Sequence, residues 1–111
     1  MVDESTLKIV RDYLKALRNN GVPVSFGVVF GSSAKGKAGP WSDIDLLVVS
    51  PRFDNMRARS DVALLWRIAA RTDSRVEPIP CGETRWLEND ASPIIEIARR
   101  EGQRVTASES A

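Results

Sequence analysis

The chain contains 111 residues, with 16 Lys and Arg against 15 Asp and Glu, a single Cys and no His. Its length predicts one domain, and its net charge of +1 gives no bulk electrostatic reason to bind nucleic acid or membranes. Without His, a Ser-His-Asp triad and a His-ligated zinc site are excluded, so any catalysis must use carboxylates, amines or a hard cation with oxygen ligands.

The hydrophobic pattern then alternates between helices and strands. Apolar residues at helical spacing predict a first helix over Ser5–Asn20, which Gly21 and Pro23 end. Two short apolar runs predict strands over Val24–Phe30 and Ile44–Val49, the second of them buried on both faces. The later predicted elements are a helix that begins between Asn55 and Ser60 and ends near Arg71, a strand over Arg75–Pro80, a helical turn over Glu83–Asn89 and a helix over Ser92–Arg100.

This order of elements predicts an α/β (α+β) fold, in which helices pack on one small β-sheet of at least three strands. Residues 1–102 are expected to form the single domain. Residues from about Gln103 are small and polar, so 103–111 are expected to be a flexible C-terminal tail. The lone Cys81 and the lack of an apolar run of about 20 residues or a signal-peptide core favour a cytoplasmic location without membrane association.

The segment between the first two predicted strands contains the residues best suited to chemistry. Gly31, Gly36 and Lys37 match the G-x-x-x-x-G-K part of a phosphate-binding P-loop. However, Ala38 stands where that loop needs a hydroxyl group for magnesium, and Gly39-Pro40 would break the helix that must follow. A P-loop is therefore disfavoured.

A second interpretation starts from two carboxylates in the same segment. Asp43 and Asp45 are two residues apart at the start of a strand, so their side chains project from the same face. Two carboxylates about 4 Å apart repel by roughly 4 kcal/mol at an effective dielectric constant of 20, and a divalent cation such as Mg²⁺ would offset that repulsion. Gly31-Ser32, directly after a strand, can present backbone N–H groups and a hydroxyl group to a phosphate.

Part of this segment follows a known signature. It reads Gly31-Ser32, Gly36 and then Ser42-Asp43-Ile44-Asp45-Leu46, and so resembles the G-S-x-x-x-G and S-D-x-D-L signature of the DNA polymerase beta-like nucleotidyltransferase superfamily. The resemblance is to its small "minimal nucleotidyltransferase" members, and it implies their mixed-sheet fold and transfer of NMP from an NTP to an acceptor hydroxyl. It also implies two Mg²⁺ ions held by Asp43, Asp45 and a third carboxylate, for which Glu77 is the candidate. The triphosphate would be held by Gly31, Ser32, Gly36 and Ser42.

The resemblance also implies partners. Minimal members frequently pair with helical HEPN-domain proteins in toxin–antitoxin systems, where the nucleotidyltransferase neutralises a ribonuclease toxin by binding it or by attaching AMP to it. ATP is therefore the expected nucleotide, and a HEPN-domain or other small helical protein is the expected partner. A chain of 111 residues has no room for a separate acceptor-binding domain, so the acceptor must come from elsewhere.

Other interpretations stay open at this point. The chain could be a catalytically weak binding module that neutralises its partner by complex formation, or a solitary nucleotide sensor. In structural terms, Ser42-Asp43 could form a turn, Asp45 could be a charge that protects a strand edge, and Glu77 could simply be solvated. Trp41 could stack on a nucleobase, but a loop Trp beside Pro40 more often packs on its own loop.

Overall fold

A computed structural model describes residues 2–31, 34, 42–55, 59–88 and 92–107. Within these residues the chain forms a four-stranded sheet with the order β3-β2-β1-β4. Its strands are β1 (Phe26–Phe30), β2 (Ile44–Ser50), β3 (Val76–Gly82) and β4 (Gln103–Val105). β1 runs antiparallel to both β2 and β4, whereas β2 and β3 are parallel, so the sheet is mixed. The predicted fold class is confirmed, with strand β1 two residues shorter at its start than expected.

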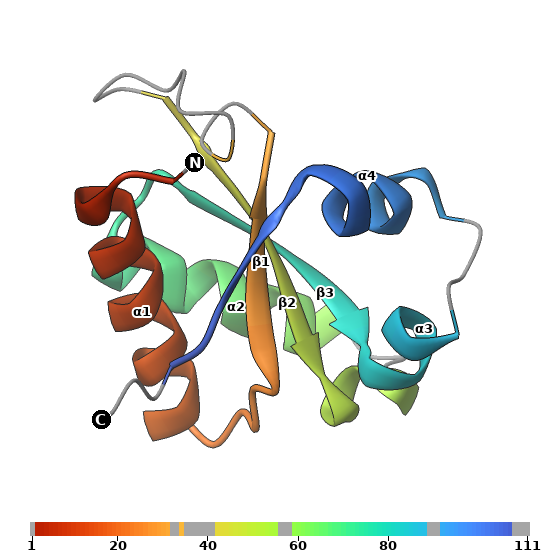
Figure 1. Cartoon of the computed structure of the whole chain (residues 1–111). Coiled ribbons are helices and arrows are strands. Elements are labelled where there is room, and N and C mark those ends of the chain that lie inside the picture. The colour runs from red at the N-terminus through yellow and green to blue at the C-terminus, as the bar shows by residue number, and fades with distance from the viewer. Residues whose placement is uncertain (1, 32–33, 35–41, 56–58, 89–91, 108–111) are drawn as a thin grey trace.

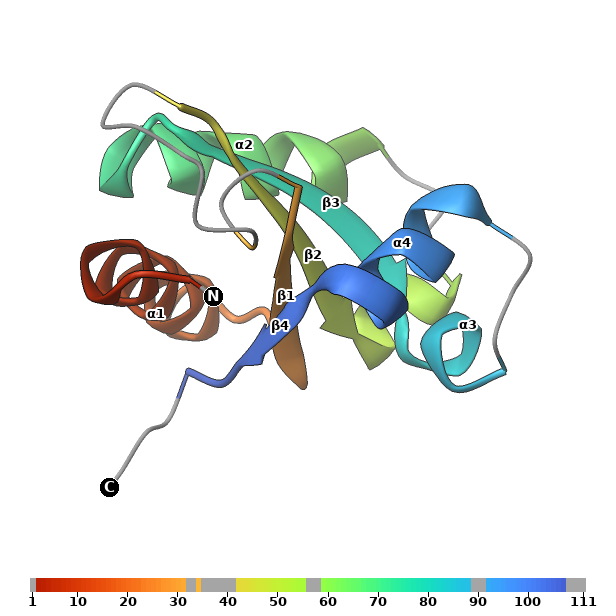
Figure 2. The same ribbon diagram turned by 45° about the horizontal axis from the view of Figure 1, so that its top comes forward.

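Helices cover both faces of this sheet (Figures 1 and 2). On one side lie α1 (Glu4–Asn19) and α2 (Arg59–Thr72), and on the other lie α3 (Glu83–Leu87) and α4 (Pro93–Glu101). A short 3₁₀ helix, η1 (Pro51–Asn55), connects β2 to the segment before α2. Because successive side chains of a strand point to opposite faces, β2 contributes Leu46 and Val48 to the α1/α2 core and Leu47 and Val49 to the α3/α4 core.

Helix α1 forms where the apolar spacing predicted a helix. Asp3 caps its start, because the Asp3 Oδ1 atom accepts a hydrogen bond of 2.8 Å from the backbone N–H of Thr6. Val10, Leu14 and Leu17 are fully buried on its inner face. No helix among the described residues has both the length and the apolar character that crossing a bilayer requires.

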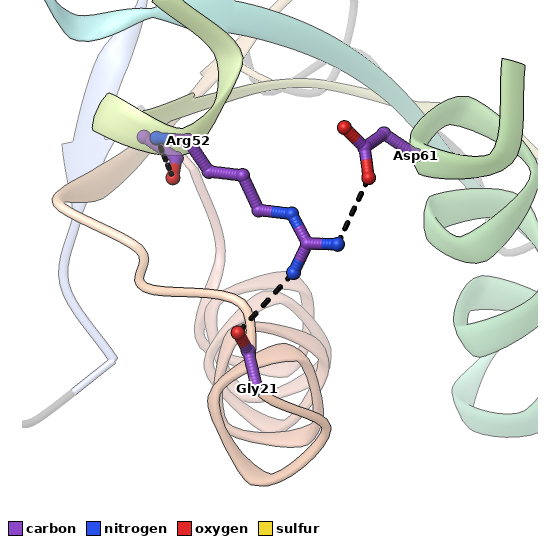
Figure 3. A network of polar contacts seen from close by, with 4 residues as sticks. Gly21, Arg52 and Asp61 are labelled. Carbon is purple, nitrogen blue, oxygen red and sulfur yellow. Dashed lines mark hydrogen bonds and ion pairs between the residues drawn. The ribbon is translucent and has the colours of Figure 1, made fainter. Parts of the chain in front are cut away.

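A side chain from η1 joins the ends of the two helices on the α1/α2 side (Figure 3). The Arg52 Nη1 atom donates a hydrogen bond of 3.3 Å to the Gly21 carbonyl oxygen, just beyond α1. The Arg52 Nη2 atom lies 2.9 Å from the Asp61 Oδ1 atom in the first turn of α2. Arg52 therefore positions the segment that follows β2 against both helices.

The end of the chain differs from the prediction of a flexible tail over 103–111. Gln103–Val105 form β4, which pairs with Gly27–Val29 of β1, and Val105 and Ala107 are buried. The tail prediction is therefore wrong for these residues, while 108–111 lie outside the described part. Three residues with a single apolar side chain are too few to show the alternation of a strand. The order of Gln103–Val105 comes instead from pairing with β1.

Candidate active site

The strand register brings three of the predicted site residues to one end of the sheet. β1 ends at Phe30, whose register partner in β2 is Asp45, so Gly31 follows directly beside Asp45. On the other side of β2, Asp45 is the register partner of Glu77 in β3. The turn residue and the two carboxylates therefore come from three neighbouring strands, although Glu77 is 32 positions from Asp45 in the sequence.

The carboxylates also share a face. Asp45 lies two and four residues before Leu47 and Val49 of the α3/α4 core, so the three side chains share one face of β2. Glu77 has the same spacing to Ile79 and Cys81 in β3. Asp43 is exposed and lies two residues before Asp45. The structure thus places Asp45 and Glu77 on one face of the sheet.

The pKa values of Asp45 and Glu77 are both raised by their surroundings. Burial raises the pKa of Asp45 above its usual range, and the negative charge of Asp43 adds to the increase. A hydrogen bond with the Asp43 side chain raises the pKa of Glu77, and burial and the charges of Asp43 and Asp45 raise it further. The negative charge of Asp43 therefore disfavours ionisation of Asp45, and the charges of Asp43 and Asp45 disfavour ionisation of Glu77.

Gly31 brings the backbone of the turn against this acidic group. Its φ of +75° is in the left-handed region, where side chains other than hydrogen are strained. A Cβ atom at Gly31 would lie only 2.5 Å from the Asp45 Oδ2 atom, which is closer than non-bonded atoms can approach. Glycine is required here both for conformation and for space, so the turn and the Asp45 carboxylate are packed directly together.

The donor chemistry fits a hard divalent cation. Asp43, Asp45 and Glu77 offer only carboxylate oxygens, which Mg²⁺ prefers. Among the residues that the structure describes, no three Asp, Glu or Cys side chains are arranged as a ready-made metal site. A cation here would be held by these carboxylates together with the phosphate oxygens of a substrate, which is a usual way in which proteins bind Mg²⁺.

Not every predicted site residue can be placed. Ser42 is half-buried next to Asp43, whereas Ser32 and Gly36 lie outside the described residues, as does Trp41. The sequence analysis did not single out a cavity whose lining includes Leu47 and Ile79, each two residues beyond a carboxylate. Because residues two apart in a strand share a face, the sequence could have indicated that these two positions lie on the same face as Asp45 and Glu77.

Comparisons with known proteins agree with this fold. Among solved structures, a protein of Sulfolobus solfataricus assigned as a nucleotidyltransferase is 18% identical, with a TM-score of 0.63, and the match covers 88% of this chain and 77% of that one. A toxin–antitoxin structure with AMP-PNP is 22% identical, with a TM-score of 0.61 and coverage of 89% and 74%. A chain from the complex of tri-AMPylated HEPN toxin with MNT antitoxin of Shewanella oneidensis is 19% identical, with a TM-score of 0.56 and coverage of 92% and 73%.

At these levels of identity the structural matches establish the fold. No curated protein sequence matches the chain. The model of the nucleotidyltransferase domain family matches residues 7–102, which is most of the chain and includes the turn and all three carboxylates. The chain therefore belongs to the nucleotidyltransferase domain family, and we identify it as a nucleotidyltransferase.

Proposed function

We propose that this nucleotidyltransferase transfers AMP from ATP to a hydroxyl group on a partner protein, with Asp43, Asp45 and Glu77 as its catalytic carboxylates. The observation that carries the proposal is the register of β1, β2 and β3. It sets Asp45 beside Glu77 on one side and beside the Gly31 turn on the other. Acidic side chains next to a backbone turn suit a reaction at the phosphates of a nucleotide.

Asp43 and Asp45, with Glu77 beside them, would hold Mg²⁺, and two ions are expected in the active complex. When bound, the ions neutralise the phosphate charges and make the acceptor hydroxyl group easier to deprotonate. Gly31, Ser32, Gly36 and Ser42 would hold the triphosphate. The left-handed turn at Gly31 supports this role, because a small residue there lets the backbone approach an anion closely.

The reaction itself is a displacement at the α-phosphorus. The acceptor oxygen forms a bond to the α-phosphorus of ATP, the bond from that phosphorus to the oxygen bridging to the β-phosphate breaks, and pyrophosphate leaves. The hydroxyl proton passes to a carboxylate of the chain. Glu77 is the candidate for this role, since the register of β2 and β3 sets it beside Asp45.

We further propose that the acceptor is a HEPN-domain toxin or another small helical protein, and that the chain acts as its antitoxin. The support is the fold shared with chains of toxin–antitoxin complexes, one of which contains AMP-PNP and another a tri-AMPylated HEPN toxin. The nucleotide and the modification in those structures favour ATP as the donor.

The proposal can be tested by following label from α-³²P-labelled ATP in the presence of Mg²⁺ and a co-purified small helical partner. The wild-type chain should label the partner, and Asp45→Asn should not, although it should still form the complex. Asp12→Asn is the matched control, because Asp12 is an exposed carboxylate paired with Lys8 at 2.8 Å on α1, which packs on the opposite face of the sheet from Asp45 and Glu77.

Two results would contradict the proposal. One is the absence of transfer from any nucleotide to a folded, bound partner. The other is full neutralisation of the partner by Asp45→Asn, which would instead support a binding module that acts by complex formation alone.

A further inference from the structure

The exposed side of helix α2 differs in charge from those of α1 and α4. Helices α1 and α4 each carry an exposed ion pair between opposite charges four residues apart. These pairs are Lys8 with Asp12 at 2.8 Å and Glu96 with Arg100 at 3.5 Å. On α2 the charges with this spacing are Arg67 and Arg71, which are both exposed and both positive. Like charges four residues apart on a helix repel each other, so the fold gains no stability from this pair.

The surroundings of the two arginines do not offset their charge. Residues 62–72 contain no Asp or Glu. Among the residues that the structure describes, no acidic side chain forms an ion pair with Arg67 or Arg71. The exposed side of α2 is therefore a local positive surface on a chain whose net charge is only +1.

The same side of α2 also carries apolar residues. The Trp66 side chain is 46% exposed, although tryptophan is largely buried in most proteins. Ala63 and Ala70 are three residues before and four residues after Trp66, so these exposed residues lie along one side of the helix. We call Ala63, Trp66, Arg67, Ala70 and Arg71 the outer face of α2. Because alanine side chains are short, another helix can approach this face closely on both sides of the Trp66 ring.

Contacts elsewhere on α2 hold the helix in place. The buried Tyr13 hydroxyl group of α1 donates a hydrogen bond of 2.9 Å to the Leu65 carbonyl oxygen. In the first turn, the Asp61 Oδ1 atom lies 2.9 Å from the Arg52 Nη2 atom. Neither contact involves a side chain of the outer face. The fold therefore fixes this face in position without using it, and a surface that is already ordered binds a partner at a lower cost in conformational entropy.

Charge and spacing together indicate the chemistry of a partner. Arg67 and Arg71 are about 6 Å apart along the helix axis, which is also the separation of two carboxylates four residues apart on another helix. Tryptophan and arginine are enriched among the residues that contribute most to protein–protein binding. Single-stranded RNA can also stack on tryptophan and pair with arginine, but a net charge of +1 and the two alanines favour a protein.

We infer that the outer face of α2 is a docking site for an acidic amphipathic helix of another protein. Carboxylates of that helix pair with Arg67 and Arg71, and one of its apolar side chains packs against the Trp66 ring. Helix α2 packs on the opposite face of the sheet from Asp45 and Glu77. Docking on α2 is therefore separate from the acidic site and does not depend on the proposed transfer reaction.

Short helical peptides provide a direct test with the full chain. Three peptides share one stripe of leucines and carry Glu, Gln or Lys at the positions beside it. Binding is followed by NMR through the indole N–H signal of Trp66, which is assigned with the variant Trp66→Phe. The Glu peptide should shift this signal and bind roughly tenfold more tightly than the Gln peptide, with an affinity that falls as salt is added. The Lys peptide should not bind.

Two double variants give the matched control. Arg67→Ala combined with Arg71→Ala removes two positive charges from the outer face, and Lys15→Ala combined with Arg18→Ala removes two exposed positive charges from α1. The first double variant should bind the Glu peptide roughly tenfold more weakly, whereas the second should bind it as the wild type does. Both should keep a melting temperature close to that of the wild type, because all four side chains are exposed.

The inference is overturned if the Glu and Gln peptides bind equally well, if the two double variants bind the Glu peptide equally well, or if no peptide shifts the Trp66 signal. A single-stranded uridine oligonucleotide serves as a further probe. If it binds more tightly than the Glu peptide and loses affinity in the Arg67 and Arg71 double variant, the outer face binds RNA instead. None of these probes is a nucleoside triphosphate, so a failure here is distinguishable from a failure of the proposed function.

Discussion

Gly31 and Gly21 both adopt the left-handed conformation, but they differ in their surroundings. Gly21 has a φ of +86° and open space where a Cβ would be, whereas a Cβ at Gly31 would meet the Asp45 carboxylate at 2.5 Å. The pair therefore separates two effects, the cost of the backbone conformation and the cost of a steric clash at the candidate site.

We expect Gly21→Ala to destabilise the fold by roughly 1–2 kcal/mol, which is the usual cost of the left-handed conformation for an L-residue. Gly31→Ala should cost at least about 1 kcal/mol more and should also displace the Asp45 side chain. Urea denaturation measures the free energies of unfolding, and calorimetry with AMP-PNP and Mg²⁺ measures nucleotide binding. Equal losses of stability for the two variants would show that the close approach to Asp45 does not add to the loss in free energy of unfolding.

Asp45 should reduce the stability of the protein at neutral pH. Burial raises the pKa of Asp45 in the folded state, and the negative charge of Asp43 raises it further, so the ionised form is disfavoured relative to the unfolded chain. The penalty is complete above the folded-state pKa, decreases as the pH falls through it, and disappears below the unfolded-state value.

Without metal, Asp45→Asn should therefore be more stable than the wild type by about 0.5–1 kcal/mol at pH 7. The difference should shrink as the pH is lowered through the raised pKa, because protonation removes the same charge from the wild type. Denaturation curves at several pH values in the presence of a chelator test this. A difference that stays constant or grows toward acidic pH would contradict the predicted direction.

The site residues differ in how far sequence reasoning could reach them. Asp43 and Asp45 could be paired from spacing alone, because alternation in a strand puts residues two apart on one face. Their relation to Gly31 needs the antiparallel pairing of β1 with β2, and that of Glu77 needs the register of β2 with β3. Register depends on contacts between segments far apart in the chain, so it cannot be obtained from local patterns.

At the scale of elements, the sequence predicted α1 and β2 well because each has a long or uniform apolar pattern, whereas β3 continues two residues beyond its predicted end. For helix α4, the apolar pattern alone did not predict which face is buried. Its Ile95 and Ala98 are buried, but Ile94 and Ile97 stay largely exposed. Three isoleucines within four residues are compatible with more than one inward face, and only the packing against β1 and α3 decides between them. The Arg99 guanidinium group over the Trp86 ring, 4.6 Å from its centroid, also favours the observed face.

Strand β4 was missed because its order depends on a distant partner. Its contribution can be measured with Val105→Ala, which removes two methyl groups from a side chain that is 4% exposed in the α1/α2 core. We expect a loss of about 2 kcal/mol, whereas the exposed neighbour Thr106→Ala should change stability by less than about 0.5 kcal/mol. Thermal or urea unfolding measures both. A loss below about 0.5 kcal/mol for Val105→Ala would show that β4 contributes little to the fold.

At the scale of the whole molecule, the sheet separates two hydrophobic cores, which differ in size and in the residues beside them. The α1/α2 side is packed from both helices and all four strands, and Arg52 links the ends of those helices. The α3/α4 side is smaller, carries Asp45 and Glu77, and holds a cavity of about 180 Å³. The sequence predicted helices on a sheet, but it did not predict which helices share a face, because that depends on the order of the strands.

The position of β4 also affects how the protein is made. β1 has β2 as one neighbour and β4 as the other, and Gln103–Val105 are translated long after Phe26–Phe30. A nascent chain that ends before Gln103–Val105 leaves one edge of β1 uncovered, and an uncovered strand edge can pair with other polypeptides. Nascent chains that lack β4 therefore expose an edge of β1 that the complete fold covers.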